Sequence, residues 1–319
     1  MDNGTIMRHT PFYIITAGST YLDIDAYACM VAMAELLGLE GKAAVAYSTA
    51  PPNYSVCPSL LFPHQVADEL PQDFDATTAK YIIVDVSDPA YLSSSVPLEQ
   101  VIEVYDHHTG FEAYWQEKIG DGARISFIGA AATLIYEEWQ KADLLGKMSP
   151  DTAKLLVAAI LDNTLNLTST NATKADRDAF LALSRIANVG EDFSASYFSE
   201  VQGKVEEDLQ NALFSDLKTL KGQSELPPYI AQIAVWDPQS ILEKLSVIRK
   251  WFAHFDGWML NVIDICRKCS YFICDSSLYQ KKIEAIFHVH FHAGVAKTPI
   301  PYLRKEIIKK TKRKSKAGQ

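Results

Sequence analysis

Three side chains able to bind a metal stand together in the first half of the chain. Asp106, His107 and His108 directly follow an apolar, strand-like run that starts at Val101, and Gly110 then favours a turn. Open α/β sheets bind ligands at the carboxyl ends of their strands, which is where this triplet lies. Taken alone, such a triplet is more typical of a solvated loop.

Aspartates that follow other apolar runs change this interpretation. Residues 14–17 form a strand-like run and lead to Asp23 and Asp25, while residues 81–84 lead to Asp85. Asp162 ends a largely apolar helix, where an uncompensated carboxylate is disfavoured both by burial and by the helix dipole. A cation at a shared edge of the sheet would compensate these carboxylates.

The residue types in this set indicate which cation and which reaction to expect. Carboxylates and imidazoles without a cysteine favour a hard divalent cation such as Mn²⁺ or Mg²⁺ over a thiolate-bound zinc. Two such cations that share a bridging carboxylate, about 3.5–4 Å apart, activate water for attack on phosphorus. The set therefore predicts hydrolysis of phosphoesters or phosphoanhydrides. The chain contains neither a Gly-x-Ser-x-Gly motif nor a phosphate-binding P-loop motif.

A second set of potential ligands lies near the carboxyl end of the sequence. Its members are Cys266, Cys269 and Cys274, followed by the alternating His288, His290 and His292. The cysteines fall in and between two predicted strands, and no second Cys-x-x-Cys pair completes four ligands, so structural thiols are favoured over zinc. The histidines could supply imidazoles, but their alternation is also typical of a strand with one solvated face.

Strands and helices alternate through the first 190 residues, which predicts a mostly parallel sheet flanked by helices. The second half has a different pattern, with strands expected near residues 229–235, 259–265 and 271–273 in a smaller α/β domain. We therefore expect domains at residues 1–190 and 197–308, joined by a short polar linker at residues 191–196. The basic residues 309–319 are expected to form a disordered tail.

Length and charge limit the classes of function. The 319 residues suit two domains of ordinary size, and the formal net charge of −9 makes nucleic-acid binding by the body of the protein unfavourable. A solvated tail is favoured over a nucleic-acid or anionic-membrane role for residues 309–319. The sequence has no apolar run of signal-peptide or membrane-spanning length, so we expect a cytoplasmic protein without a membrane partner.

The order and spacing of these motifs resemble the DHH phosphoesterase superfamily. The motifs are Asp23-Ile24-Asp25, Asp85, Asp106-His107-His108 and Asp162-Asn163-Thr164. The second half is similar to the DHHA2-type substrate domain of manganese-dependent family II inorganic pyrophosphatases and of the prune and exopolyphosphatase group. That part of the resemblance rests on Asp216-Leu217-Lys218, on residues 230–233 and on Arg304-Lys305. The Gly-Gly-Gly-His stretch typical of the oligonucleotide-cleaving subfamily is absent from the sequence.

The resemblance implies a role for each of these residues. Asp25, Asp85, His107 and Asp162 would hold one divalent cation and Asp23 with Asp85 the other, Mn²⁺ being favoured over Mg²⁺ or Co²⁺. Asp106 would orient the imidazoles and His108 would face the substrate phosphate. Lys218, Arg304 and Lys305 would close over the phosphates from the second domain, so that the active site lies in a cleft between the domains.

One position departs from the pyrophosphatase pattern. Ser19 stands four residues before Asp23, where the family II pyrophosphatases have a metal-binding histidine, and the prune and exopolyphosphatase group also lacks that histidine. The prediction is therefore a two-metal hydrolase of pyrophosphate or short polyphosphate, a small phosphate-containing substrate. The alternatives are an oligonucleotide or cyclic dinucleotide phosphodiesterase and a catalytically weak metal- or phosphate-binding regulatory protein. A homodimer is compatible with the resemblance.

Overall fold

The computed structural model describes residues 11–61, 65–71, 74–215, 217–220 and 225–317. The chain forms two compact units, of which the first extends to Asn163 and resumes at residues 171–190. The second unit contains Thr164–Thr170 and the chain from Glu191 onward. The segment at 164–170, which the predicted division at residue 190 had placed in the first domain, thus belongs to the second unit.

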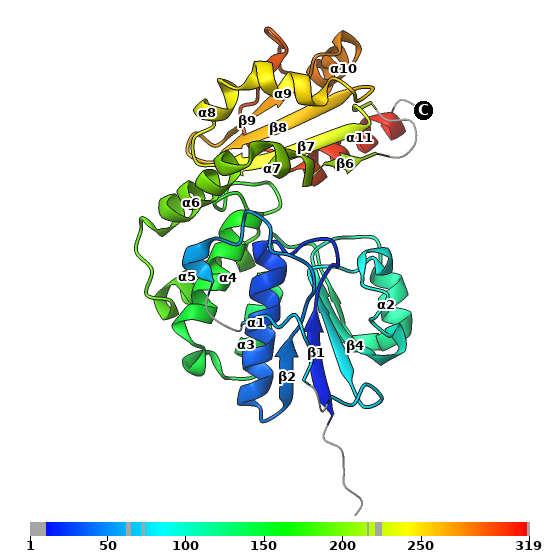
Figure 1. Ribbon diagram of the computed structural model, residues 1–319, viewed down its shortest axis with the longest axis vertical. Helices are drawn as coiled ribbons and strands as arrows, with labels where there is room; N and C mark the ends of the chain where they lie inside the picture. The colour runs from blue at the N-terminus through cyan, green and yellow to red at the C-terminus, as the bar shows by residue number, and fades with distance from the viewer. Residues whose placement is uncertain (1–10, 62–64, 72–73, 216, 221–224, 318–319) are drawn as a thin grey trace, which may run out of the picture. The chain divides into compact units, whose positions relative to one another are not determined.

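The first unit is built on a five-stranded parallel sheet with the strand order β2-β1-β3-β4-β5 (Figure 1). The strands are β1 (Phe12–Thr16), β2 (Ala43–Ala46), β3 (Lys80–Val84), β4 (Val101–Asp106) and β5 (Ala123–Ile125). The order reverses between β1 and β3, so that the chain leaves these two neighbours in opposite directions. A reversal of this kind opens a crevice at the carboxyl ends of the strands, where open α/β sheets bind their ligands.

Helices cover both faces of this sheet. They are α1 (Ile24–Leu39), α2 (Glu112–Ile119), α3 (Ala131–Lys141), α4 (Pro150–Asn163) and α5 (Lys174–Ile186), with short 3-10 turns η1 (Pro58–Leu60), η2 (Pro89–Tyr91), η3 (Leu98–Gln100), η4 (Gly120–Gly122) and η5 (Leu145–Lys147). On one face, Trp115 of α2 packs into a core with Ile14, Ile83 and Val104. Helix α1 is buried along most of its length, as expected for its Ala- and Met-rich sequence.

The second unit contains a mixed five-stranded sheet with the order β10-β9-β8-β7-β6, in which only β7 and β8 are parallel. Its strands are β6 (Lys218–Thr219), β7 (Tyr229–Val235), β8 (Trp258–Asp264), β9 (Cys269–Ile273) and β10 (Val295–Lys297). Its helices are α6 (Phe193–Glu207), α7 (Leu209–Ser215), α8 (Gln239–Leu242), α9 (Leu245–Phe252), α10 (Ser277–Phe287) and α11 (Arg304–Ala317). The predicted fold class, a mostly parallel sheet with helices plus a second α/β domain, is confirmed.

The structure differs from the sequence-based expectations in local detail. Helix α6 begins at Phe193, inside the predicted linker, and α11 continues through residues 309–317 of the predicted tail. Ile307 anchors α11 because it is fully buried in the core of the second unit. Residues 239–252, whose sequence pattern predicts one helix, form the two helices α8 and α9.

The strand that was one explanation of the alternating histidines is not formed at residues 287–292. Helix α10 ends at Phe287, and His288 has a left-handed backbone with φ of 56°. That conformation reverses the chain after the helix and removes the period of two on which the strand prediction rested.

Within the described residues, no helix is both long enough and apolar enough to cross a membrane. The cytoplasmic location and the homodimer stay predictions.

Candidate metal centre

Four of the predicted site residues lie close together where β3 and β4 end in the first unit. Asp85 directly follows β3, Asp106 is the last residue of β4, and His107 and His108 come next. Ligand atoms of these four residues all lie within 4.8 Å of one another. Asp25, from the first turn of α1, has its Oδ2 atom 3.9 Å from Nε2 of His107. The reversal in strand order therefore brings together side chains that are up to 83 residues apart in sequence (Asp25 to His108).

His107 is held in one orientation by the main chain. Its Nδ1 lies 2.8 Å from the carbonyl oxygen of Gly129, and a carbonyl only accepts hydrogen bonds, so Nδ1 carries the proton. In the neutral ring, Nε2 then presents a lone pair to Oδ1 of Asp85 at 3.3 Å and to Oδ2 of Asp25 at 3.9 Å. A lone pair facing two carboxylates calls for a positive charge between them, and a backbone carbonyl behind the ring is the usual second contact of a metal-binding histidine. The residues therefore fit a divalent cation.

Asp25 is fully buried at the start of two helices. Its Oδ2 accepts a hydrogen bond from the amide of Ala131 at 2.9 Å, and its Oδ1 accepts one from Ala132 at 2.8 Å. These are the first two amides of α3, whose positive end favours a carboxylate. Burial nevertheless raises the pKa of Asp25 to about 8, and the charge of nearby Asp23 acts in the same direction. A cation would oppose both effects.

Asp85 has a left-handed backbone conformation, with φ of 56°. Its amide still donates to the carbonyl of Tyr105 at 2.8 Å, so the sheet ladder continues up to the turn. This conformation costs a non-glycine residue about 1–2 kcal/mol, and such strain concentrates at functional sites. The chain turns sharply at Asp85, and the carboxylate comes to lie beside His107.

Asp106 supports the two histidines that follow it. Its Oδ1 accepts hydrogen bonds from the amides of His107 and His108 and lies 2.8 Å from Nδ1 of His108. Its other oxygen, Oδ2, is buried and has no hydrogen-bond partner among the described residues. His108 is about half exposed, with 53% of its side-chain surface accessible. With Nδ1 bonded to Asp106, the ring is left with Nε2 for a ligand.

Asp23 and Asp162 lie at the ends of helices in the first unit. Asp23 is the N-cap of α1, and its carboxylate accepts from the amide of Ala26 at 3.0 Å. Helices α1 and α4 run antiparallel, because Glu35 near the end of α1 accepts hydrogen bonds from Ser149, which precedes α4.

The antiparallel packing places Asp162 near the first turn of α1. Glu35 of α1 also accepts a hydrogen bond from Thr152 of α4. Asp25 lies ten residues before Glu35 on α1, and Asp162 lies ten residues after Thr152 on α4. In antiparallel helices both steps run about 15 Å toward the same end of the pair. The tight cluster of Asp85, Asp106, His107 and His108 does not itself include Asp23, Asp25 or Asp162.

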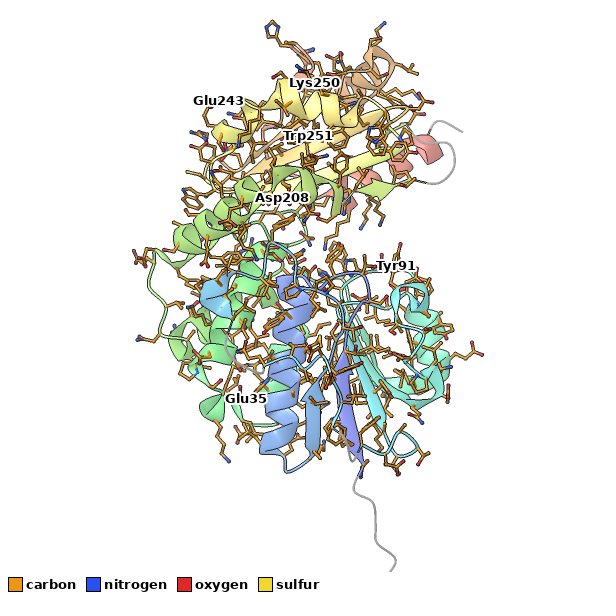
Figure 2. The ribbon with its side chains drawn as sticks, viewed as in Figure 1. Glu35, Tyr91, Asp208, Glu243, Lys250 and Trp251 are labelled. Atoms are coloured by element: carbon orange, nitrogen blue, oxygen red, sulfur yellow. The ribbon has the colours of Figure 1, made fainter. Side chains whose placement is uncertain are left out.

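Ser19 makes a specific contact of its own. Its hydroxyl donates to the carbonyl oxygen of Tyr91 at 3.0 Å, and its amide donates to the same oxygen at 2.9 Å. The loop before α1 is thereby fastened to the turn η2 after β3. Figure 2 labels Tyr91 at this end of the first unit and Glu35 at the opposite end. His64, the distant residue that could replace the histidine ligand absent at position 19, lies outside the described residues.

The positively charged side chains predicted to bind the substrate phosphates all lie in the second unit. Lys218 was expected in a helical region but lies exposed in the edge strand β6, paired with Ile230 of β7. Arg304 and Lys305 begin α11. The amide of Arg304 donates to Oε1 of Gln232 at 2.5 Å, and Gln232 in turn accepts from Asn261 at 3.1 Å. Asp216 lies outside the described residues.

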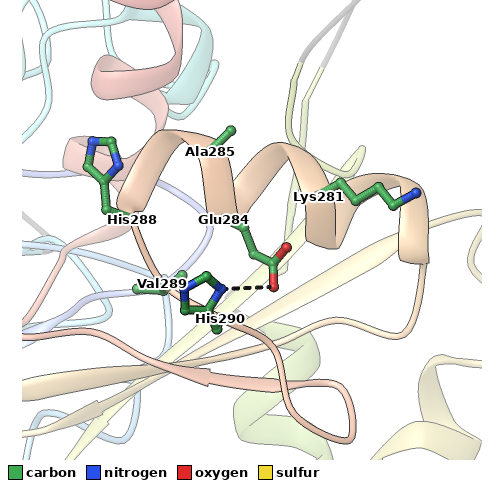
Figure 3. A pocket seen from close by; sticks show the side chains of 6 residues that line it. All are labelled: Lys281, Glu284, Ala285, His288, Val289 and His290. Atoms are coloured by element: carbon green, nitrogen blue, oxygen red, sulfur yellow. Dashed lines mark ion pairs between the residues drawn. The ribbon is translucent and has the colours of Figure 1, made fainter.

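The histidines near the carboxyl end do not converge. Figure 3 shows a pocket of about 450 Å³ lined by Lys281, Glu284, Ala285, His288, Val289 and His290. The His290 ring lies 4.0 Å from Glu284, while the His288 ring points in another direction. The cysteines with which they were considered are free thiols, of which Cys269 and Cys274 are buried and Cys266 is exposed.

Sequence reasoning missed two contributors to the metal centre. Gly129 acts through its carbonyl, which no side-chain pattern reveals. The local sequence around Asp176 predicts only a helix start, and Asp176 does form a capping box with Thr173 at the start of α5. It is also fully buried and bonded to the amide of Gly129 at 3.0 Å.

Several known proteins are similar to this chain in sequence. The chain is 29% identical over 176 residues to a "probable manganese-dependent inorganic pyrophosphatase" of Deinococcus radiodurans, covering 53% of this chain and 52% of that protein. A protein of the same name from Staphylococcus carnosus is 24% identical over 267 residues, covering 77% of this chain and 83% of that one. The chain is similar in sequence to proteins named as manganese-dependent inorganic pyrophosphatases. The predicted resemblance is thereby confirmed.

The relationship to these pyrophosphatases extends to the fold. A crystal structure from Methanococcus jannaschii, assigned to the family II inorganic pyrophosphatases, superimposes with a TM-score of 0.66 at 20% identity, covering 95% of this chain and 98% of that one. The match to the Deinococcus relative spans about half of that protein's length. No model of a known protein family matches the chain.

Proposed function

We propose that this protein is a metal-dependent hydrolase of phosphoanhydride bonds, acting on inorganic pyrophosphate or short-chain polyphosphate. The observation that supports this most directly is the orientation of His107. Its Nδ1 donates a hydrogen bond to the carbonyl oxygen of Gly129, and its Nε2 faces the carboxylates of Asp25 and Asp85. An enclosed imidazole and two carboxylates are suited to a hard divalent cation, and Mn²⁺ is favoured because the relatives carry that metal in their names.

Each residue of the site has a proposed role. Asp25, Asp85, His107 and Asp162 would hold one cation, and Asp23 with Asp85 a second, with Asp85 as the bridge. The two cations would supply a hydroxide at neutral pH and neutralise charge on the phosphate.

The other residues of the site would bind and orient. Asp106 fixes the ring of His108, whose Nε2 is free of that bond and would contact a phosphate oxygen. Lys218, Arg304 and Lys305 would stabilise the charge that develops on the phosphate during transfer. The role of the second unit in closing over the substrate stays a prediction.

Ser19 bears on the choice of substrate. Its hydroxyl and amide both donate to Tyr91, which supports a structural role for a residue standing where the pyrophosphatases have a histidine. A site without that imidazole should bind its second cation more weakly. We therefore propose that the enzyme needs a higher Mn²⁺ concentration for full activity than a site with that histidine would.

Phosphate release decides the proposal. The protein should release phosphate from pyrophosphate or tripolyphosphate with Mn²⁺, Mg²⁺ or Co²⁺ and should leave a dinucleotide intact. His107→Ala should abolish release, whereas Asp88→Ala, a substitution in the loop that follows Asp85, should preserve it. Cleavage of the dinucleotide alone, or no release from any substrate although calorimetry shows Mn²⁺ binding, would contradict the proposed activity.

A further inference from the structure

Asp176 makes more hydrogen bonds than its place in α5 requires. It is fully buried, and its Oδ2 accepts from the amide and the hydroxyl of Thr173, both at 2.7 Å. The bond from the Thr173 amide, together with the bond from the Asp176 amide to the Thr173 hydroxyl oxygen, forms the capping box of its own helix. The same oxygen also accepts from the amide of Gly129 at 3.0 Å, and Oδ1 accepts from the hydroxyl of Thr133 at 2.6 Å. The last two bonds reach a segment more than forty residues earlier in the chain.

The segment held by Asp176 carries the supports of two predicted metal ligands. The carbonyl of Gly129 accepts from Nδ1 of His107, and the amides of Ala131 and Ala132 donate to the carboxylate of Asp25. Residues 129–132 thus set the positions of an imidazole and of a carboxylate together. A movement of this segment would change both.

A helix cap alone does not explain this arrangement. The capping box is complete with the hydrogen bonds between Thr173 and Asp176 and does not require the bonds to residues 129–133. A carboxylate buried in a site of low polarity is costly unless it is well bonded, and here both of its oxygens accept hydrogen bonds. The two bonds to Gly129 and Thr133 connect the start of α5 to the start of α3.

We propose that Asp176 is a positioning residue for the metal centre. Through the peptide at Gly129 it fixes the Nδ1-protonated form of His107, with Nε2 turned toward Asp25 and Asp85, and thereby increases the affinity for the cation. The inference rests on the proposed metal-binding function. Asp176 itself contacts none of the predicted ligands in the described hydrogen bonds and ion pairs, and would act only through residues 129–133.

The test compares the Mn²⁺ affinity of the wild type and four variants by calorimetry. Asp176→Ala should weaken binding by about 10–100-fold, the usual effect of losing a residue that orients a metal ligand. Asp176→Asn should stay within a few-fold of the wild type, because its amide oxygen can accept the bonds of Oδ2 and its NH₂ group can donate to Thr133. Thr133→Val, which is isosteric and leaves the helix cap intact, should weaken binding several-fold. If Asp176→Ala does not fold, the Mn²⁺ affinity of Thr133→Val tests the positioning role instead.

Glu35→Ala is the matched control for general destabilisation. Glu35 also receives three hydrogen bonds, from the amide and hydroxyl of Ser149 and from Thr152, but it lies at the other end of α1 (Figure 2). It should lower the free energy of unfolding without changing Mn²⁺ affinity. In the metal-free protein, ¹⁵N NMR of the imidazole should show the Nδ1–H form of His107 in the wild type and a mixture of tautomers in Asp176→Ala.

The outcomes separate the inference from the proposed function. A wild type that binds no Mn²⁺ would overturn both. A wild type that binds Mn²⁺, with Asp176→Ala binding as tightly or Glu35→Ala losing as much affinity, would overturn the positioning role alone. Weakened binding in Asp176→Ala and Thr133→Val, recovery in Asp176→Asn and a changed His107 tautomer would support it.

Discussion

Asp25 should make the stability of the metal-free protein depend on pH. Burial raises the pKa of this carboxyl to about 8 in the folded chain, against 3.8 for an ordinary aspartate. Below about pH 4 both the folded and the unfolded states hold the proton, and the contribution to stability is fully present. As the pH rises toward 8 the unfolded chain ionises first, so stability is lost until the folded chain ionises as well.

The size of this effect follows from proton linkage. One proton more in the folded than in the unfolded state lowers the free energy of unfolding by up to about 1.4 kcal/mol per pH unit. Over this pH range the loss from Asp25 amounts to several kcal/mol, a large part of the stability of an ordinary domain. Asp25→Asn should remove this pH dependence. The new side-chain amide will also lower the free energy of unfolding by an amount that does not depend on pH, because it faces the amides of Ala131 and Ala132.

Urea unfolding in the presence of a chelator, at intervals from pH 5 to 8, measures the slope. Asp88→Asn is the control, because Asp88 is only the cap of η2 and should leave the slope unchanged. Added Mn²⁺ should reverse the trend, since binding requires the carboxylate, and should release about one proton at pH 7 in the wild type and fewer in Asp25→Asn. Equal slopes in the wild type and Asp25→Asn would refute the reasoning.

Three further predictions concern activity. Asp85→Ala should lower metal-dependent phosphate release by at least about 10³-fold, because the bridging carboxylate is lost, while Asp88→Ala keeps most of the activity. If steady-state kinetics found Asp88→Ala inactive and Asp85→Ala active, the wrong residue of this loop would have been assigned. Neutralising Lys218, Arg304 or Lys305 should lower kcat with little change in calorimetric Mn²⁺ affinity, and unaltered kinetics in all three variants would remove them from the site. Ser19→His should tighten a weak second Mn²⁺ site and favour pyrophosphate over tripolyphosphate, whereas two equally tight sites in the wild type would contradict this.

The sequence was informative about the first unit because its signals are local. The apolar run of β3 is followed directly by Asp85 and that of β4 ends in Asp106, so each strand and its candidate ligand are visible in the same few residues. The parallel order then follows from the alternation with helices, and it brings the strand ends to one edge. The capping box of Thr173 and Asp176 was likewise visible as a local pattern.

The second unit was harder to predict because its boundaries depend on tertiary contacts. Lys218 lies in a two-residue strand that is defined by its pairing with Tyr229 and Ile230 of β7. The alternating histidines after Phe287 have the period of a strand, yet the left-handed backbone at His288 ends α10 and leads into a turn. The helix α11 continues into basic residues because Ile307 and Thr311 are buried on one side of it. None of these outcomes is determined by the residues nearest in sequence.

The metal centre shows why ligand types are easier to predict than ligand geometry. Aspartate and histidine side chains can be recognised one by one, but the usefulness of His107 as a ligand depends on which of its nitrogens carries the proton. That choice is made by a main-chain carbonyl at Gly129, and any residue type at position 129 would present the same atom. What fixes that carbonyl is the carboxylate of Asp176, a residue that the sequence displays only as the cap of another helix. The metal affinity of such a site therefore depends on residues that position the main chain around the ligands. These residues are found by following the hydrogen bonds that lead outward from each ligand.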